Sequence, residues 1–390
     1  MKRIISFALA LGLTVTMAGA TCVEDMDTAV QTYGMPQPIN REILQRDQMP
    51  TQQPQNGQAV ESQSVYNDPY LSYQWAITET GADLTWEAVS QDGASIVVAV
   101  VDSGVDYTHE DLENRVLVDL GYDFVNDDDD PMDDNGHGTH VSGIIAAEAD
   151  NGVGIAGMAG TLDVSILPIK VLNSEGAGET ADITAGILYA VDMGVDVLNL
   201  SLGADVITPD VRDAIETALE ADIFVVVAAG NDGTVCAPLS LANLNGVFTV
   251  AAATESNTVA DFSNYGDCID GYAPGEDILS TYLDNQYAYQ DGTSMAAPIV
   301  SGAAAVILSQ NSDLTNAELT SLLSTTATST TSNVQTVNNT PMAPNVQTKP
   351  ISMPTMRSQA LQMLIQYSPM SFNTMTCTTV NVYEALMNMG

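Results

Sequence analysis

Basic residues are scarce in this chain. Lysine and arginine together number 9, whereas aspartate and glutamate number 50, which gives a formal net charge of −41. Such a surface repels nucleic acids and anionic membranes, so neither is an expected partner. The excess also costs stability through self-repulsion unless salt or bound cations offset it. Four explanations of the acidic excess remain open: a salty habitat, dependence on bound cations, protection from Lys/Arg-specific proteases, or simply a solvated acidic surface.

Cysteine and histidine are also few, at 4 and 3 residues. No two cysteines have CxxC spacing, and nitrogen and sulfur ligands are too few for a zinc site to be expected. Four cysteines fit an oxidising compartment. Long apolar runs are absent beyond the N-terminal region, so membrane insertion is not expected.

The N-terminus has the pattern of a secretory signal peptide. Lys2 and Arg3 precede a largely apolar stretch, 4–17, which ends in an Ala-Gly-Ala cleavage pattern. We therefore expect residues 1–20 to be removed and the protein to be secreted. Cys22 raises a lipid-anchored form as an alternative, although the residues before it fit such a site poorly.

Two later stretches are polar and irregular. Residues 21–64 are rich in Gln, Pro and Asn without a sustained period, which favours a short, disordered or removable prosegment. Residues 65–390 can bury a large core as one domain. A polar insertion at about 325–376 interrupts this domain, and a short helix is expected after it at 381–386.

Short runs rich in valine and isoleucine alternate with helical patterns in the domain. The runs are apolar on both faces, as a parallel sheet covered by helices on both sides requires. The pattern predicts strands at Ser95–Val101, Val164–Val171, Val195–Leu200, Ile223–Ala228 and Gly246–Ala252. It predicts helices at Gly138–Ala149, Thr180–Met193, Pro209–Ala221, Thr293–Ser309 and, after a Thr315/Glu318 capping box, Leu314–Leu323. The expected fold class is α/β, with three layers and a mainly parallel central sheet.

Three short segments carry side chains suited to nucleophilic catalysis. Asp102 lies in Val-Val-Asp-Ser-Gly, His137 in Asn-Gly-His-Gly-Thr-His and Ser294 in Gly-Thr-Ser-Met-Ala-Ala-Pro. A serine hydroxyl is a weak nucleophile and needs a base within hydrogen-bond reach, which a histidine oriented by a carboxylate supplies. Asp102 is predicted to end a strand and Ser294 to begin a helix, and sites of this kind assemble at such positions.

These motifs, in the order Asp, His, Ser, resemble the signature of the subtilisin-like serine peptidases (subtilases), particularly their thermitase- and aqualysin-like secreted members. The resemblance covers about residues 67–325 and the terminal helix. It implies that Ser294 is the nucleophile, that His137 is the base and that Asp102 orients it. Peptide bonds would then be hydrolysed through an acyl-enzyme.

A fourth element is Asn231, in Ala-Ala-Gly-Asn after an apolar strand. It resembles the oxyanion-hole asparagine of subtilases, whose amide and the backbone N–H of Ser294 would meet the negative oxygen of the intermediate. A turn-capping Asn-Asp-Gly is the alternative. The family pattern gives no catalytic role to His109 or His140, and both are expected to be structural.

The resemblance also implies a peptide-binding cleft. An extended substrate would pair with edge segments of the domain, which gives affinity with little sequence preference. Small residues would leave a roomy first pocket with no basic or obvious acidic base, so large apolar or aromatic side chains are expected before the scissile bond. The residues expected to bind substrate are Gly176, Ser201, Leu202, Gly203, Ala228, Ala229 and Gly230.

Two structural Ca²⁺ sites are expected. One matches the ligands of thermitase-like subtilases, with carbonyl oxygens completing the cage. The other is the acidic loop 123–130, whose carboxylates repel one another unless a cation or water screens them; a solvated acidic loop is the alternative. The expected ligands are Asp68, Asp111, Glu148, Asn151, Val153 and Ile155 in the first site, and Asp123, Asp128 and Asp130 in the second.

Positions similar to Cys236 and Cys268 are bridged in some extracellular subtilases, so the resemblance implies a disulfide here. Two buried free thiols are the alternative. Cys22 and Cys377 would remain, and the sequence does not show whether they pair.

We therefore expect a secreted, calcium-stabilised serine endopeptidase of broad specificity, made as a zymogen and acting as a monomer on proteins or peptides. An inactive extracellular binding protein on the same scaffold and a narrow processing protease are the alternatives. Loss of a triad residue or of Asn231 would favour the inactive binding protein. A deep, strongly acidic first pocket would favour the processing protease. The sequence shows neither feature.

Overall fold

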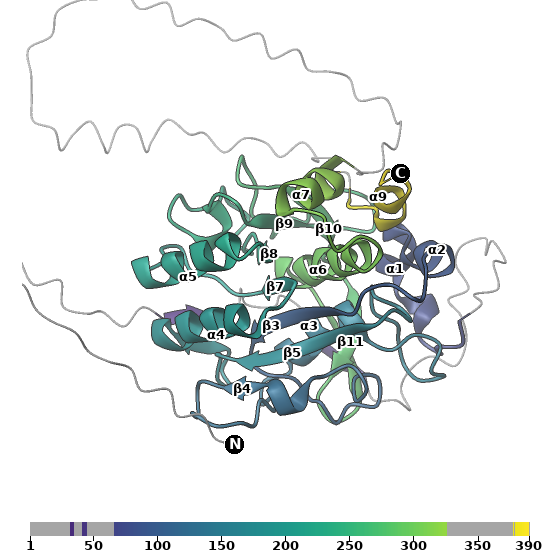
Figure 1. Cartoon of the computed structure of the whole chain (residues 1–390), viewed down its shortest axis with the longest axis horizontal. Helices are drawn as coiled ribbons and strands as arrows, with labels where there is room; N and C mark the ends of the chain where they lie inside the picture. Colours follow the sequence, from purple (N-terminus) through teal and green to yellow (C-terminus); the bar gives the residue numbers. More distant parts are fainter. Residues whose placement is uncertain (1–31, 35–40, 45–65, 326–376, 378, 390) are drawn as a thin grey trace, which may run out of the picture.

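The computed structural model describes residues 32–34, 41–44, 66–325, 377 and 379–389 (Figure 1). The expected signal peptide, Cys22 and nearly all of the polar insertion lie outside these residues, as does most of the expected prosegment.

A seven-stranded parallel sheet forms the centre of the molecule, in the order β10-β9-β8-β7-β3-β5-β4. Each of the five predicted strands is present, with its ends shifted by two residues or fewer. The strands are β3 (Ile96–Asp102), β4 (Tyr122–Asp123), β5 (Val164–Lys170), β7 (Val197–Leu200), β8 (Phe224–Ala228), β9 (Phe248–Ala253) and β10 (Gly271–Pro274).

Helices cover both faces of this sheet (Figure 1). Successive side chains of a strand point to opposite faces, and β3 shows the consequence. Val98 and Val100 belong to one buried apolar cluster with α3 (His137–Ala146) and α6 (Thr293–Gln310). Ala99 and Val101 belong to a second cluster with α4 (Thr180–Met193) and α5 (Pro209–Glu220). The fold is therefore the three-layer α/β arrangement that the sequence predicts.

Shorter helices surround these layers. They are α1 (Trp75–Thr80), α2 (Ala82–Ala88), α7 (Asn316–Thr325) and α9 (Val382–Met387), with 3₁₀ turns at Leu71–Tyr73, Val118–Leu120 and Leu241–Asn243. The capping box before α7 is confirmed, because Thr315 Oγ1 accepts from Glu318 N while Thr315 N donates to the Glu318 carboxylate. α6 is long and apolar enough to cross a membrane, but 94% of that span is buried inside the protein, as in the core helix of a globular domain.

Two small sheets lie beside the central one. β11 (Ile278–Tyr282) and β12 (Gln286–Gln290) form an antiparallel hairpin to which β2 (Arg41–Leu44) adds a third strand. β1 (Thr32–Gly34) pairs with β6 (Ala177–Glu179). β1 and β2 fall within residues 21–64, where the sequence predicts no regular structure. Their own residues show no strand periodicity, and they are ordered as strands by pairing with the edges of the domain.

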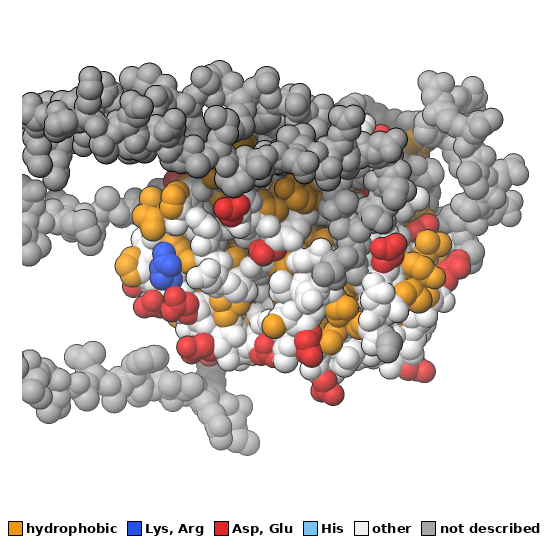
Figure 2. Space-filling view, turned by 90° about the horizontal axis from the view of Figure 1, so that it is seen from above, with side chains coloured by type: hydrophobic (Ala, Val, Ile, Leu, Met, Phe, Trp, Pro, Cys, Tyr) orange, Lys and Arg blue, Asp and Glu red, His pale blue; other side chains and the backbone are white. Residues whose placement is uncertain are grey.

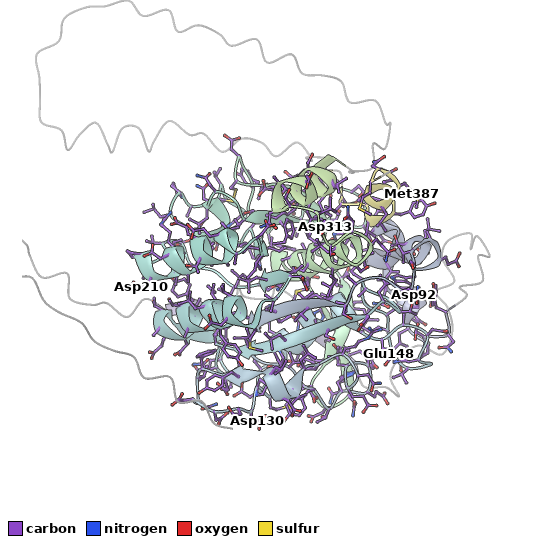
Figure 3. All side chains as sticks on the ribbon, viewed as in Figure 1. Asp92, Asp130, Glu148, Asp210, Asp313 and Met387 are labelled. Carbon is purple, nitrogen blue, oxygen red and sulfur yellow. A yellow bond between two sulfur atoms is a disulfide. The ribbon has the colours of Figure 1, made fainter. Side chains whose placement is uncertain are left out.

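Besides the cluster in the loop 123–130, acidic side chains are distributed over the surface. Asp92, Asp130, Glu148, Asp210 and Asp313 lie in different parts of the molecule (Figure 3). On the face seen in Figure 2, separate acidic groups alternate with polar and apolar patches, and very little of the face is basic. The surface therefore offers no continuous positive patch on this face.

Candidate active site

Asp102 and His137 meet at the carboxyl edge of the sheet. Asp102 ends β3 and His137 begins α3, and both side chains are fully buried. His137 Nδ1 lies 2.8 Å from Asp102 Oδ1 and 3.0 Å from Oδ2. A carboxylate in this position holds the proton on Nδ1 and leaves Nε2 to act as a base. His137 Nε2 is buried and has no hydrogen-bond partner among the described residues.

Asp133, which the sequence analysis did not single out, ties these two residues together. Its carboxylate accepts hydrogen bonds from Ser103 Oγ (2.8 Å), Gly136 N (2.9 Å) and Thr139 Oγ1 (2.6 Å). Ser103 Oγ in turn accepts from Gly138 N at 3.0 Å. Burial raises the pKa of Asp133, against the lowering effect of these donors. The only sequence feature that could have pointed to Asp133 is its position shortly before the His137 motif.

Ser294 is the second residue of α6, where backbone N–H groups of the first turn lack helical partners. Its side chain is almost fully buried, and its hydroxyl donates to the carbonyl oxygen of Ser201 at 3.2 Å. Ser201 Oγ donates back to the Ser294 carbonyl at 3.0 Å. The structure thus couples the serine to the segment after β7, and in this conformation the hydroxyl bonds to Ser201 rather than to a histidine.

Asn231 lies beside the same helix start. Its Oδ1 accepts from Thr293 N (2.9 Å) and from Thr293 Oγ1 (2.8 Å). Its Nδ2 is buried and has no hydrogen-bond partner among the described residues. A Cβ at position 292 would lie only 3.2 Å from this Nδ2, so glycine there avoids a tight contact with the amide group. The side chain is an oriented donor without an acceptor.

A cavity of about 410 Å³ opens beside Asn231. Of the predicted substrate-binding residues, the structure brings Gly203, Ala228, Ala229 and Gly230 together in its lining. It also places Asp205 and Asp232 there, two carboxylates that the sequence analysis did not include. The other lining residues are Gly34, Asn231, Ala237, Ser240, Leu241, Ala242, Ala204 and Asn264. Ser201, Leu202 and Gly176 are not part of the lining but lie in the flanking edge segments.

The N-terminal strand β1 lies between those two edge segments. Tyr33 is paired with Gly178 and Gly34 with Ala177 on one side. On the other side, Gly34 N donates to Gly203 O at 3.3 Å and Gly203 N donates to Gly34 O at 3.2 Å. Gly34 therefore pairs in antiparallel fashion with both edge segments at once.

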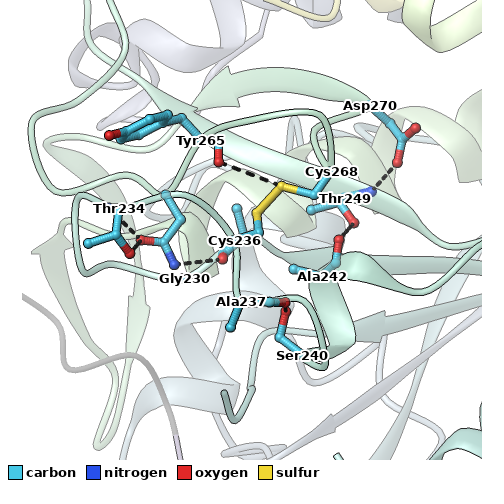
Figure 4. The surroundings of a disulfide bond; sticks show 12 residues. Gly230, Thr234, Cys236, Ala237, Ser240, Ala242, Thr249, Tyr265, Cys268 and Asp270 are labelled. Atoms are coloured by element: carbon cyan, nitrogen blue, oxygen red, sulfur yellow. Dashed lines mark hydrogen bonds between the residues drawn. A yellow bond between two sulfur atoms is a disulfide. The ribbon is translucent and has the colours of Figure 1, made fainter. Parts of the chain in front are cut away.

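The disulfide between Cys236 and Cys268 is present, with an S–S distance of 2.02 Å, as the family resemblance implies. It lies next to the segment that carries Ala237, Ser240 and Ala242 of the cavity lining (Figure 4). Cys377 is buried and forms no disulfide with another described cysteine.

The two other histidines hold the β11–β12 hairpin. His140 Nε2 lies 3.1 Å from Ile278 O and 2.9 Å from Ala288 O. His109 Nε2 lies 3.0 Å from Gln286 O, while its Nδ1 accepts from Asp111 N, which fixes a neutral tautomer. Burial lowers the pKa of His109, in keeping with that neutral form.

The residues predicted for the first calcium site come together. Asp111 Oδ1 accepts from Asn151 Nδ2 at 2.9 Å, and the Asp68 carboxylate accepts from Asp150 N and Asn151 N. Burial raises the pKa of both Asp68 and Asp111, and the negative charge of Asp111 raises that of Asp68 further. The predicted carbonyl donors Glu148, Val153 and Ile155 lie in the same loop after α3.

The acidic loop 123–130 is arranged differently. Asp123 is buried and its oxygens accept from Val125 N, Asn126 N and Asn126 Nδ2. Asp128 and Asp130 are exposed and accept hydrogen bonds from the loop itself and from Tyr107. Among the residues that the structure describes, no group of three or more His, Cys, Asp or Glu is placed to hold a metal ion.

Comparison with known proteins gives consistent matches. The protein-family model described as "Subtilase family" matches residues 93–342 of this chain. The thermophilic serine proteinase of Bacillus sp. (strain AK1) is 47% identical over 247 residues, which cover 63% of this chain and 60% of that protein. Thermitase of Thermoactinomyces vulgaris is 40% identical over 251 residues, which cover 64% of this chain and 88% of thermitase.

A solved structure also matches. The crystal structure of a cold adapted subtilisin-like serine proteinase superposes with a TM-score of 0.55 and 34% sequence identity, covering 60% of this chain and 83% of that one. The chain spans less than two thirds of the length of the Bacillus proteinase.

Proposed function

Because the chain belongs to the subtilase family and is a subtilisin-like serine protease, we propose that it is a secreted, calcium-stabilised endopeptidase of broad specificity. Asp102, His137 and Ser294 form its catalytic triad. The observation that carries the assignment is the unpartnered Nδ2 of Asn231, an oriented donor beside the first turn of the helix that carries Ser294.

The reaction starts when Ser294 gives up its hydrogen bond to Ser201 and passes its proton to His137 Nε2. The serine oxygen attacks the peptide carbonyl, and Asn231 Nδ2 with Ser294 N meets the negative oxygen that develops. His137 then returns the proton to the leaving amine, which leaves an acyl-enzyme that water hydrolyses by the same steps. Asp102 holds the imidazole and stabilises its charged form.

Protein and peptide substrates bind in extended form between the segments 176–178 and 201–203. Gly203 offers both its N–H and its C=O at this edge, and it already pairs with a strand of the chain itself. The small walls of the neighbouring cavity favour large apolar or aromatic side chains before the scissile bond. Asp205 and Asp232 extend this range toward basic side chains.

The protein is made as a zymogen. β1 occupies the edge that an extended substrate needs, and β2 pairs with β12, the strand that leads directly to Ser294. Release of this N-terminal segment frees the cleft. The signal peptide at residues 1–20 directs secretion, and the mature enzyme is a monomer.

Calcium binds where Asp68, Asp111 and Asn151 meet. Burial raises the pKa values of both carboxylates, a cost that a bound cation would offset, and the hard oxygen donors of the site suit Ca²⁺. The carbonyls of Glu148, Val153 and Ile155 would complete the cage. Asp123, Asp128 and Asp130 form a second, more exposed site.

A fluorophosphonate probe tests the catalytic proposal. After secretion and processing, the wild-type protein is expected to gain one adduct at Ser294 by peptide mapping, and Ser294→Ala to gain none. Ser301→Ala, which alters a buried serine further along α6, is the matched control and should label like the wild type. Absence of labelling in folded, processed wild-type protein would overturn the triad assignment.

A further inference from the structure

Asp133 is a buried carboxylate that acts only as an acceptor in the hydrogen bonds of the described residues. Three of its donors are backbone N–H groups at and before the start of α3, those of Asn135, Gly136 and Thr139. The other two are the hydroxyls of Ser103 and Thr139. Because a hydroxyl can donate one hydrogen bond while it accepts others, Asp133 fixes the direction in which both hydroxyls donate.

Each of these hydroxyls passes the constraint on by accepting a second hydrogen bond. Ser103 Oγ accepts from Gly138 N at 3.0 Å, and Thr139 Oγ1 accepts from Asp106 N at 2.8 Å. Each bond joins the segment after β3 to the first turn of α3. These are the two elements that carry the catalytic carboxylate and the imidazole.

Ser103 contacts both sides of the catalytic pair. Its N–H donates to Asp102 Oδ1 at 2.7 Å, whereas its hydroxyl accepts from the residue that follows His137. The two backbones are also in close contact, since a Cβ at Gly138 would collide with the carbonyl oxygen of Gly104. A shift of the Ser103 hydroxyl therefore changes how the imidazole lies against the carboxylate.

We propose that Asp133 is a positioning residue of the proteolytic reaction, which acts through the two hydroxyls to hold His137 against Asp102. It works indirectly and is not itself a catalytic residue. Its effect can still be large, because a displacement of about 1 Å in a catalytic group costs roughly 10²-fold in rate. The inference rests on the proposed function, since it concerns how the same imidazole is held.

Ser103→Ala removes one of the two hydroxyls. The end of β3 stays anchored in this variant, because the buried Lys170 Nζ still donates to the carbonyl oxygen of residue 103 at 2.7 Å and to Leu172 O at 3.0 Å. We expect kcat to fall by roughly 10²-fold with KM unchanged. Ser309→Ala, which removes a buried hydroxyl at the other end of α6 from Ser294, is the matched control and should equal the wild type.

Asp133→Asn is the second variant. An amide turns an NH₂ group toward part of this donor set, so one of the two hydroxyls loses its acceptor. We expect kcat to fall, and the melting temperature to fall with it because Asp133 also accepts from the start of α3. Asn381→Ala controls for the loss of a helix cap, since Asn381 Oδ1 accepts from Glu384 N at the start of α9. It should lower the melting temperature without changing kcat.

A His137→Ala background separates positioning from a structural role. Without the imidazole, a residual rate of roughly 10³–10⁴-fold over water is expected from the oxyanion hole and binding. Measured on an activated p-nitrophenyl peptide ester, this residual rate should not fall further when Ser103→Ala or Asp133→Asn is added, because no imidazole remains to be held. An equal loss in both backgrounds, or an unchanged kcat in folded Ser103→Ala, would overturn the proposal. Failure of the proposed function looks different, since the wild type itself would then neither hydrolyse the ester nor be labelled at Ser294.

Discussion

Asp102 and Asp111 are both buried carboxylates, but their partners differ. Asp102 faces the imidazole of His137 and accepts from Ser103 N. Asp111 accepts from Asn151 Nδ2, Ile155 N and the Tyr287 hydroxyl, which are neutral, and burial raises its pKa. Asp102 therefore already faces a basic side chain, whereas under the proposed calcium site a bound cation would balance the charge of Asp111. Changes at the first should affect rate, and changes at the second should affect stability.

The largest effect is expected for Asp102→Asn. The amide keeps the shape of the side chain but favours the wrong tautomer of His137, and kcat should fall by about 10⁴-fold. The melting temperature should change little. A steady-state assay beside a thermal melt checks this, with Asp111→Asn as the matched substitution that should leave kcat intact. If both variants lose activity equally, the assignment of Asp102 to catalysis and of Asp111 to stability is wrong.

A smaller loss of rate is expected for Asn231→Ala. The variant removes the donor to the developing oxyanion, and kcat should fall by roughly 10²–10³-fold with little change in KM, the range known for such donors in subtilisin. Because Asn231 also accepts from Thr293, its folding must be checked by a thermal melt. A rise in KM at constant kcat would instead assign Asn231 to substrate binding.

The sequence predicted those parts of the molecule in which local pattern and motif coincide. Apolar runs placed the five strands, and Asp102, His137 and Asn231 follow from motifs at strand and helix ends. β1 and β2 could not be predicted, because their strand form comes from pairing with distant edges and not from their own residues. Asp133 was missed for a related reason, since its role lies in contacts that no spacing rule encodes.

Removing calcium should lower stability in a pH-dependent way. Asp68 and Asp111 have raised pKa values in the folded state, so without a cation their contribution is fully present below the unfolded value near 4 and is lost as pH rises through the folded values. In chelator, the melting temperature should therefore fall as pH increases from about 4. Calcium at a hundred times its Kd should restore about 2.7 kcal/mol. Asp111→Asn should remove most of this restoration, and a melting curve unaffected by chelator at neutral pH would exclude the site.

The smallest effect is expected in the acidic loop. Asp128 is exposed, and exposed charges gain little from a bound cation because water already screens them. Asp128→Asn should thus reduce the calcium-dependent rise in melting temperature by only about one degree, against the large loss expected for Asp111→Asn. Titrating calcium into both variants, with melting followed at fixed ionic strength, separates a specific ion from general screening. A loss in Asp128→Asn as large as that in Asp111→Asn would show that burial is not what makes a carboxylate cluster depend on calcium in this fold.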